Sequence, residues 1–210
     1  MKKIYRILIY TLGLFALALG IVLNTKANLG VSPIISIPYG ISTIWKINLG
    51  AATAAIYVLY VLGQIVLLGK DFQPIQILQI PMSILFGMLI NFFSAFILIN
   101  SSNLLFNLFL LLLGIICTGI GASFTLLMNI LPNAADGFVQ AVSIRTGKKL
   151  GTAKNMLDAS SVIITILIGL LFDGKIVGIG IGTVIAVICI GRVIALINVL
   201  MKKRLTAIAC

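Results

Sequence analysis

Six long apolar runs, separated by shorter and more polar segments, dominate this sequence. A helix needs roughly 20 mainly apolar residues to cross the hydrocarbon core of a bilayer, and each run is long enough. Of all residues, 61% are hydrophobic and 9% are charged, whereas a soluble domain is about half apolar and a quarter charged. The sequence therefore predicts an all-α, polytopic helical membrane protein. The predicted spans are Tyr5–Leu23, Gly50–Gly69, Ile75–Ile99, Leu104–Leu131, Gly151–Phe172 and Ile176–Met201.

Two further segments, Gly30–Lys46 and Pro132–Lys149, are semi-polar. Their continuous helical parts cover about 12 residues, or roughly 18 Å at 1.5 Å per residue, which is about half of a bilayer core. Ser32 precedes Pro33, as a capping residue precedes a proline at the first helical position. Asn133 is an equally good cap. We therefore expect two short half-helices that start after Ser32 and Asn133; the alternative is that both segments cross the membrane.

The chain also contains an internal repeat. A shift of 101 residues places Gly20 on Gly121 and Asn28 on Asn129, and no gap is needed through the best-matching region. The order of features repeats as well, because each half consists of a long helix, an Asn, a short semi-polar helix and two further long helices. We therefore predict two repeats of about 100 residues, with six transmembrane helices and two half-helices in total.

The topology depends on whether the short segments cross. With three spans in each half, the membrane repeats 1–101 and 102–210 must be inverted; with eight crossing segments, they are parallel. Both repeats are expected to form one integrated membrane domain. We favour the inverted arrangement, since Asn133–Arg145 is too polar for a lipid-facing span. Basic residues near both chain ends place the N- and C-termini in the cytoplasm under either arrangement.

The residue types that are present exclude several classes of protein. The chain has no His, which excludes His-ligated zinc sites and Ser-His nucleophiles. Its four acidic residues are all Asp, and the GxGD string typical of intramembrane aspartyl proteases is absent. The net charge is +11, but the basic residues end apolar runs and do not form a soluble basic face, so we expect no nucleic-acid binding. We also expect no enzymatic activity, no cofactor and no metal.

Two stretches resemble a known family. The segment ANLGVSPIISIPYG, followed by NLGAATAAIYVLYVLGQIVLLGKDFQPIQILQI, is similar to the first half of the YitT/YczE family of bacterial integral membrane proteins. The segment from Ala135, which begins ADGFVQAVSIRTGKKLGTAKNMLDASS, resembles the second half of that family. YitT proteins carry a soluble C-terminal domain, so this chain, which stops at Cys210, is closer to the short YczE-like branch. The resemblance implies a bacterial cytoplasmic membrane and many spans, and it implies no established substrate.

Asp158 and Arg192 are the ionisable residues that lie deepest in apolar runs. A charge at that depth costs at least a few kcal/mol, so it usually faces the bundle and has a partner. We predict that Asp158 pairs with Arg192. Lys154, four residues before Asp158 on the same helix face, is able to share the carboxylate. The pair would belong either to a substrate or ion pathway, or to a structural link between two helices.

Further pathway candidates lie on the short segments. Asp136 falls in the first turn of the second short helix, where the helix dipole favours a carboxylate; the alternative is a cation or proton site beside unwound backbone. Gln140 follows one turn later. The starts of the two half-helices, at Ser32 and Asn133, are predicted to approach each other near the centre of the bundle.

Two patterns favour structural roles. Gln73, Gln76 and Gln79 line one face of a helix start, which favours side chains that snorkel to the interface over the wall of a polar pathway. Gly178, Gly180 and Gly182 form a GxGxG string without the strand and the spacing of a dinucleotide loop, so we expect it to serve helix packing.

Inverted repeats with short helices are how many transporters build a binding site. The sequence therefore favours a secondary transporter or permease, with the lipid bilayer and a small solute as partners. The alternative is a non-transporting accessory factor, or the substrate-binding subunit of an energised importer. The sequence leaves open whether the chain forms homo-oligomers or binds accessory subunits.

Overall fold

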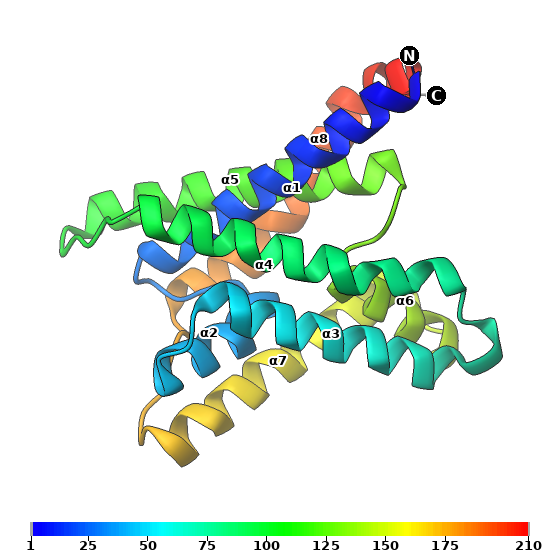
Figure 1. The fold of residues 1–210 in the computed structure, drawn as a ribbon. Coiled ribbons are helices and arrows are strands. Elements are labelled where there is room, and N and C mark those ends of the chain that lie inside the picture. The colour runs from blue at the N-terminus through cyan, green and yellow to red at the C-terminus, as the bar shows by residue number, and fades with distance from the viewer. Residues whose placement is uncertain (1, 210) are drawn as a thin grey trace. The chain divides into compact units, whose positions relative to one another are not determined.

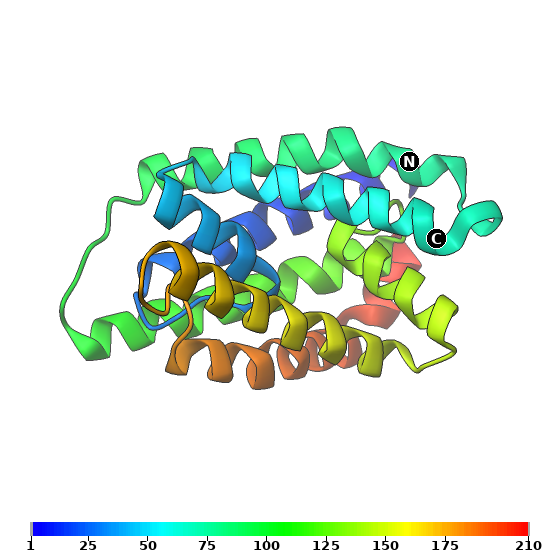
Figure 2. The same cartoon turned by 90° about the horizontal axis from the view of Figure 1, so that it is seen from below.

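A computed structural model describes residues 2–209, with side chains for residues 2–201. The described chain consists of eight α-helices and two short 3-10 turns, and it contains no strand. The turns are η1 (Gly69–Asp71) and η2 (Pro74–Leu78). The helices are α1 (Lys2–Lys26), α2 (Pro33–Trp45), α3 (Leu49–Leu68), α4 (Gln79–Phe96), α5 (Leu104–Met128), α6 (Ala134–Thr146), α7 (Leu150–Phe172) and α8 (Ile181–Ala209) (Figures 1 and 2).

Six helical segments of the described chain are long and apolar enough to cross a membrane. They contain α1, α3, α4, α5, α7 and α8. The remaining helices, α2 and α6, have 13 residues each and are too short to span. The predicted all-α membrane protein with six spans and two short helices is therefore confirmed.

The prediction for the last span was wrong at its start. We expected a continuous apolar helix from Ile176, but α8 begins at Ile181. Gly174 and Gly178 adopt positive φ values of 67° and 71°. Because these conformations are not helical, the chain turns twice between α7 and α8 before the last helix starts.

Both short helices begin where the sequence predicts. α2 starts at Pro33, and α6 starts after Asn133, whose Oδ1 accepts a hydrogen bond from the Ala135 N–H at 3.4 Å. Their ends also match: Ser42 Oγ donates to the Ile47 carbonyl and Ser143 Oγ donates to the Lys148 carbonyl, each at 2.7 Å. The two serines are 101 residues apart, so the repeat appears in local structure as well as in sequence.

Long-range packing divides the chain into two compact units. Unit 1 comprises Met1–Ser32, Phe92–Ile130 and Gly180–Cys210, and unit 2 comprises Pro33–Asn91 and Leu131–Ile179. Each unit takes segments from both halves of the chain. The units therefore do not follow the boundary between residues 101 and 102, and the division into repeats stays a prediction from sequence.

In unit 1, α1 and α5 cross at glycines (Figure 1). A Cβ added to Gly13 would lie 3.1 Å from the Gly121 carbonyl oxygen, and one added to Gly20 would lie 2.7 Å from that of Gly114. The later glycine of α1 meets the earlier glycine of α5, so the two helices are antiparallel. The shift of 101 residues turns one of these glycine contacts into the other, as a two-fold axis relating inverted repeats requires.

Further contacts complete unit 1. Arg6 on α1 caps the end of α5, because its guanidinium donates to the Met128 carbonyl at 2.8 and 3.1 Å and to the Asn129 carbonyl at 3.2 Å. The Gly182 N–H donates to the Leu29 carbonyl at 2.7 Å, and Cβ atoms added to Gly180 and Gly182 would lie 2.5 and 2.8 Å from the same oxygen. These two glycines therefore pack closely against the segment between α1 and α2, and not against another helix. The start of α1 and the end of α8 lie at the same end of this unit (Figure 1). Its buried core contains Leu23, Ala27, Leu110, Leu111, Ile115 and Ala186.

In unit 2, each short helix packs on a long helix from the other half of the chain. α2 packs on α7 and α6 packs on α3, while α2 also contacts α3 and α6 contacts α7. The first part of α4 lies against α3, where Gly50 and Gly87 bring the two backbones together. This arrangement surrounds the polar side chains described below.

Candidate functional site

Two matching polar stripes run along the long helices α3 and α7 of unit 2. Residues spaced by four, three and four positions lie on one face of a helix. The four polar residues of each stripe have this spacing, and the shift of 101 residues places one set on the other. The α3 stripe is Thr53, Tyr57, Tyr60 and Gln64, and the α7 stripe is Lys154, Asp158, Ser161 and Thr165.

The α3 stripe ends in a buried amide network. Gln64 Nε2 donates to Gln79 Oε1 at 2.8 Å and to the Ala134 carbonyl, at the start of α6, at 3.1 Å. Gln79 Nε2 donates back to Gln64 Oε1 at 3.3 Å. The interpretation of Gln79 as a snorkelling side chain was therefore wrong, since it is 1% exposed and fully engaged inside the unit. Gln73, at the outer end of the same face, is exposed as expected.

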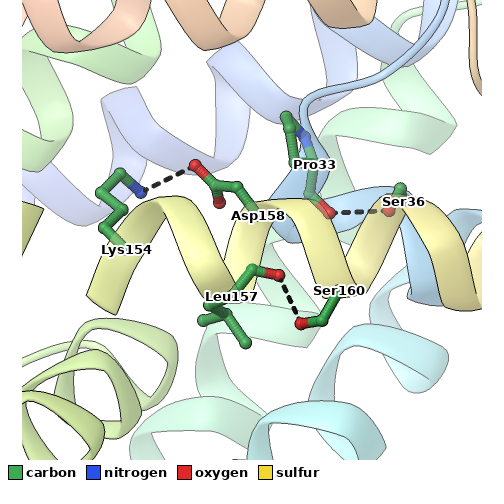
Figure 3. Close-up of polar contacts among 6 residues, drawn as sticks. All are labelled: Pro33, Ser36, Lys154, Leu157, Asp158 and Ser160. Atoms are coloured by element: carbon green, nitrogen blue, oxygen red, sulfur yellow. Dashed lines mark hydrogen bonds and ion pairs between the residues drawn. The ribbon is translucent and has the colours of Figure 1, made fainter. Parts of the chain in front are cut away.

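The α7 stripe ends in an equivalent place on α2. Thr165 Oγ1 donates to Ser36 Oγ at 2.8 Å. Ser36 in turn donates to the Pro33 carbonyl at 2.7 Å, as Figure 3 shows. Gly137 occupies the position of Ser36 in the second repeat, and a Cβ there would lie 2.8 Å from Gln64 Oε1. Each stripe therefore holds the first turn of one short helix.

Three of the predicted site residues come together in the middle of unit 2. Lys154 Nζ lies 3.8 Å from Asp158 Oδ2 (Figure 3), with side chains that are 40% and 14% exposed. Asp136 on α6 interacts electrostatically with both. Burial raises the pKa of the Asp136 carboxyl, and the positive charge of Lys154 offsets part of that rise. Among residues 2–201, Asp136 makes no ion pair or hydrogen bond of its own.

Asp158 also faces the start of α2. Along α7, Figure 3 shows Lys154 first, then Asp158, and then Pro33 and Ser36 of α2 beside the helix. The two helices run parallel, since Ser36 near the start of α2 bonds to Thr165 in the second half of α7, and their last residues, Trp45 and Phe172, pack with ring centroids 5.1 Å apart. The N-terminus of α2 therefore points toward Asp158, where the helix dipole favours a carboxylate.

The two tyrosines of the α3 stripe border this cluster. Tyr57 lies within hydrogen-bonding reach of Asn133 and interacts electrostatically with Asp136. Tyr60 lies within hydrogen-bonding reach of Ser161 and interacts electrostatically with Asp158. The hydroxyls of Tyr60 and Ser161 are buried, and neither has a hydrogen-bond partner. The cluster thus combines two carboxylates, one ammonium group and two unengaged hydroxyls.

Comparison with known proteins assigns the chain to a family. Residues 4–199 match DUF6198, which is described as a family of unknown function. The chain belongs to this family. No curated protein and no solved structure matches it. DUF6198 carries no functional description, so the resemblance to YitT and YczE proteins stays a prediction.

The other candidate residues of this DUF6198 chain lie apart from the charged cluster or at its edge. Gln140 is half-buried on α6, one turn after Asp136. Ser32 is 4% exposed and ends a segment of unit 1. Arg192 is exposed on α8 in unit 1. Since Asp158 belongs to unit 2 and pairs there with Lys154, the predicted pair with Arg192 stays a prediction, as does the approach of the two short-helix starts.

Sequence reasoning missed six residues of the two stripes: Thr53, Tyr57, Tyr60, Gln64, Ser161 and Thr165. Tyr, Ser and Thr are ordinary residues in apolar spans, so none of them draws attention singly. The signal was nevertheless present, because the spacing of four, three and four positions occurs in both halves at the shift that reveals the repeat. A comparison of polar positions between the repeats would have found both stripes.

Proposed function

We propose that this DUF6198 chain is a secondary transporter or permease that moves a small polar solute across the bacterial cell membrane. One observation carries the proposal: Asp136, Lys154 and Asp158 gather inside unit 2 of a chain that is otherwise strongly apolar. Charged side chains within membrane segments are costly, and they usually mark substrate or ion pathways. If the cluster served only to hold the helices together, apolar side chains of similar volume would stabilise the same contact equally well.

The short helices support the same conclusion. Transporters built from inverted repeats place their substrates beside the ends of discontinuous helices. Here the start of α2 points toward Asp158, and the start of α6 carries Asn133 and Asp136 beside Tyr57. Two equivalent half-helices, each held by a polar stripe, give the two repeats equivalent roles around one group of charges.

Uptake by purified protein tests the proposal. We expect proteoliposomes that contain this chain alone, without an ATPase, to accumulate at least one member of a panel of radiolabelled cationic, zwitterionic, neutral and anionic solutes. Imposed proton and sodium gradients would supply the driving force. Solute binding in detergent without uptake, followed by uptake when an energising ATPase is added, would contradict the proposal and identify the chain as the substrate-binding subunit of an importer.

A further inference from the structure

Two buried hydroxyls beside the charged cluster lack a hydrogen-bond partner. Tyr60 is 9% exposed and Ser161 is 0% exposed, and neither hydroxyl oxygen is bonded within the protein. Leaving such a group without a partner destabilises the folded state. The two residues occupy equivalent positions in the two repeats, their hydroxyls lie within reach of each other, and Asp158 interacts electrostatically with Tyr60. Both repeats therefore contribute a hydroxyl to the same place, and no other group of the described chain is bonded to either oxygen.

The charges at this place do not balance. Two carboxylates, those of Asp136 and Asp158, face a single ammonium group, that of Lys154. When both carboxylates are ionised, one negative charge remains without a counter-charge. The other charged side chains of unit 2 belong to residues that are exposed near helix ends, so they do not neutralise the cluster. They are Lys46, Lys70, Asp71, Arg145, Lys148, Lys149, Asp173 and Lys175.

We propose that unit 2 binds a small organic cation through a primary ammonium group, which is held by the Asp158 carboxylate and by the hydroxyl oxygens of Tyr60 and Ser161. This inference rests on the proposed transport function and names its substrate class. A primary ammonium group has three N–H donors and no acceptor, and it meets one carboxylate and two unengaged oxygens here. An anion in the same place would face two carboxylates.

Lys154 is placed to make room for such a ligand. Its distance of 3.8 Å from Asp158 exceeds the span of a charge-assisted hydrogen bond, about 2.7–2.9 Å, and its side chain is 40% exposed. Asp136 lies within its electrostatic reach. When the ligand occupies Asp158, Lys154 turns to Asp136, and the cluster then holds two carboxylates and two ammonium groups. Because both hydroxyls are buried, the ligand reaches them only when α3 and α7 move apart.

Thermal unfolding of the detergent-solubilised chain tests this site. Trp45, the single Trp, packs on Phe172 within unit 2 and reports on its unfolding by fluorescence. We expect n-butylammonium chloride to raise the unfolding midpoint in a concentration-dependent manner. Sodium chloride and tetramethylammonium chloride, which supply a cation without N–H donors, should leave it unchanged at equal concentrations. Equal protection by either control, or no protection by butylammonium, would overturn the proposal.

Variants separate binding from stability. Tyr60→Phe and Ser161→Ala remove unengaged hydroxyls, so each ligand-free variant should be at least as stable as the wild type, while its affinity for butylammonium falls about five- to ten-fold. Ser160→Ala is the matched control, because Ser160 is exposed and its hydroxyl donates to the Leu157 carbonyl on another side of α7 (Figure 3). Asp158→Asn should abolish the rise of the unfolding midpoint with butylammonium. If that variant does not fold, the affinities of the two hydroxyl variants test the site without it. Unchanged affinity in both hydroxyl variants would contradict the site.

The ammonium site and the transport proposal fail in different ways. Protection by butylammonium without uptake of any solute would leave the site in place and contradict transport. Uptake of a solute without an ammonium group, unaffected by excess butylammonium, would support transport and overturn the site.

Discussion

The two compact units use the same repeat in opposite ways. In unit 1, the equivalent helices α1 and α5 meet through glycines, and their backbones touch. In unit 2, the short helices meet the long ones through amide and hydroxyl groups, beside a cluster of charges. Close backbone packing permits few alternative geometries, whereas polar groups can exchange partners with a ligand. One part of each repeat therefore packs through its backbone, and another part packs through polar side chains.

The largest effect is expected where unit 1 depends on glycine. A Cβ on Gly121 would lie 2.4 Å from the Leu17 nitrogen and 2.6 Å from the Gly13 carbonyl oxygen, so a backbone has to shift. We expect Gly121→Ala to lower the stability of the chain by about 3 kcal/mol, at the upper end of overpacking costs. Thermal unfolding in detergent measures this. Gly191→Ala is the control, since a Cβ there meets nothing within 4 Å; equal midpoints for both variants would refute the glycine crossing.

A smaller loss is expected where unit 2 depends on hydrogen bonds. Gln64→Leu leaves the buried Gln79 amide without its partner, which should cost about 2 kcal/mol. The double variant Gln64→Leu with Gln79→Leu should recover part of that loss, because the second amide is no longer stranded. Gln73→Leu, at an exposed position, should change little. A double variant that loses as much as the sum of the two single variants would show that the amides act independently.

The smallest effect on stability is expected for two cysteine substitutions that test the topology of the chain. Single cysteines at Lys46 and Lys148, both exposed, should leave folding unchanged in a background in which Cys117, Cys189 and Cys210 are alanine. Inverted repeats place the two positions on opposite faces of the membrane. A membrane-impermeant thiol reagent should therefore label only one of them in sealed vesicles. Labelling of both from the same side would rule out inversion.

Much of the fold follows from sequence because its signals are local. Apolar length predicts the spans, and Pro33 and Asn133 predict the starts of the short helices correctly. The start of α8 was wrong because apolar residues around Gly178 hid a backbone turn, which depends on φ at the glycines and not on hydropathy. The local sequence pattern predicts which segments are apolar enough to span and where capped helices begin. It does not predict the backbone conformation that a glycine adopts.

The site was predicted only in part. Asp136, Lys154 and Asp158 were singled out as candidates because charges are rare in apolar runs; in the structure Lys154 pairs with Asp158 and interacts electrostatically with Asp136. Gln79 was misassigned because its partner, Gln64, lies on another helix and is invisible to helical spacing. Partners across helices depend on tertiary packing, and only the comparison of the two repeats carries that information within a single sequence.

Uptake by two Asp variants tests most directly whether the charged cluster of unit 2 binds the transported solute. Asp158→Asn and Asp71→Asn remove the same charge, one inside the cluster and one at an exposed turn. Because Lys154 is partly exposed, Asp158→Asn should fold, with little loss of stability. In proteoliposomes we expect the Asp158 variant to lose uptake of whichever solute the wild type carries and the Asp71 variant to retain it. Equal uptake by both variants would contradict the account.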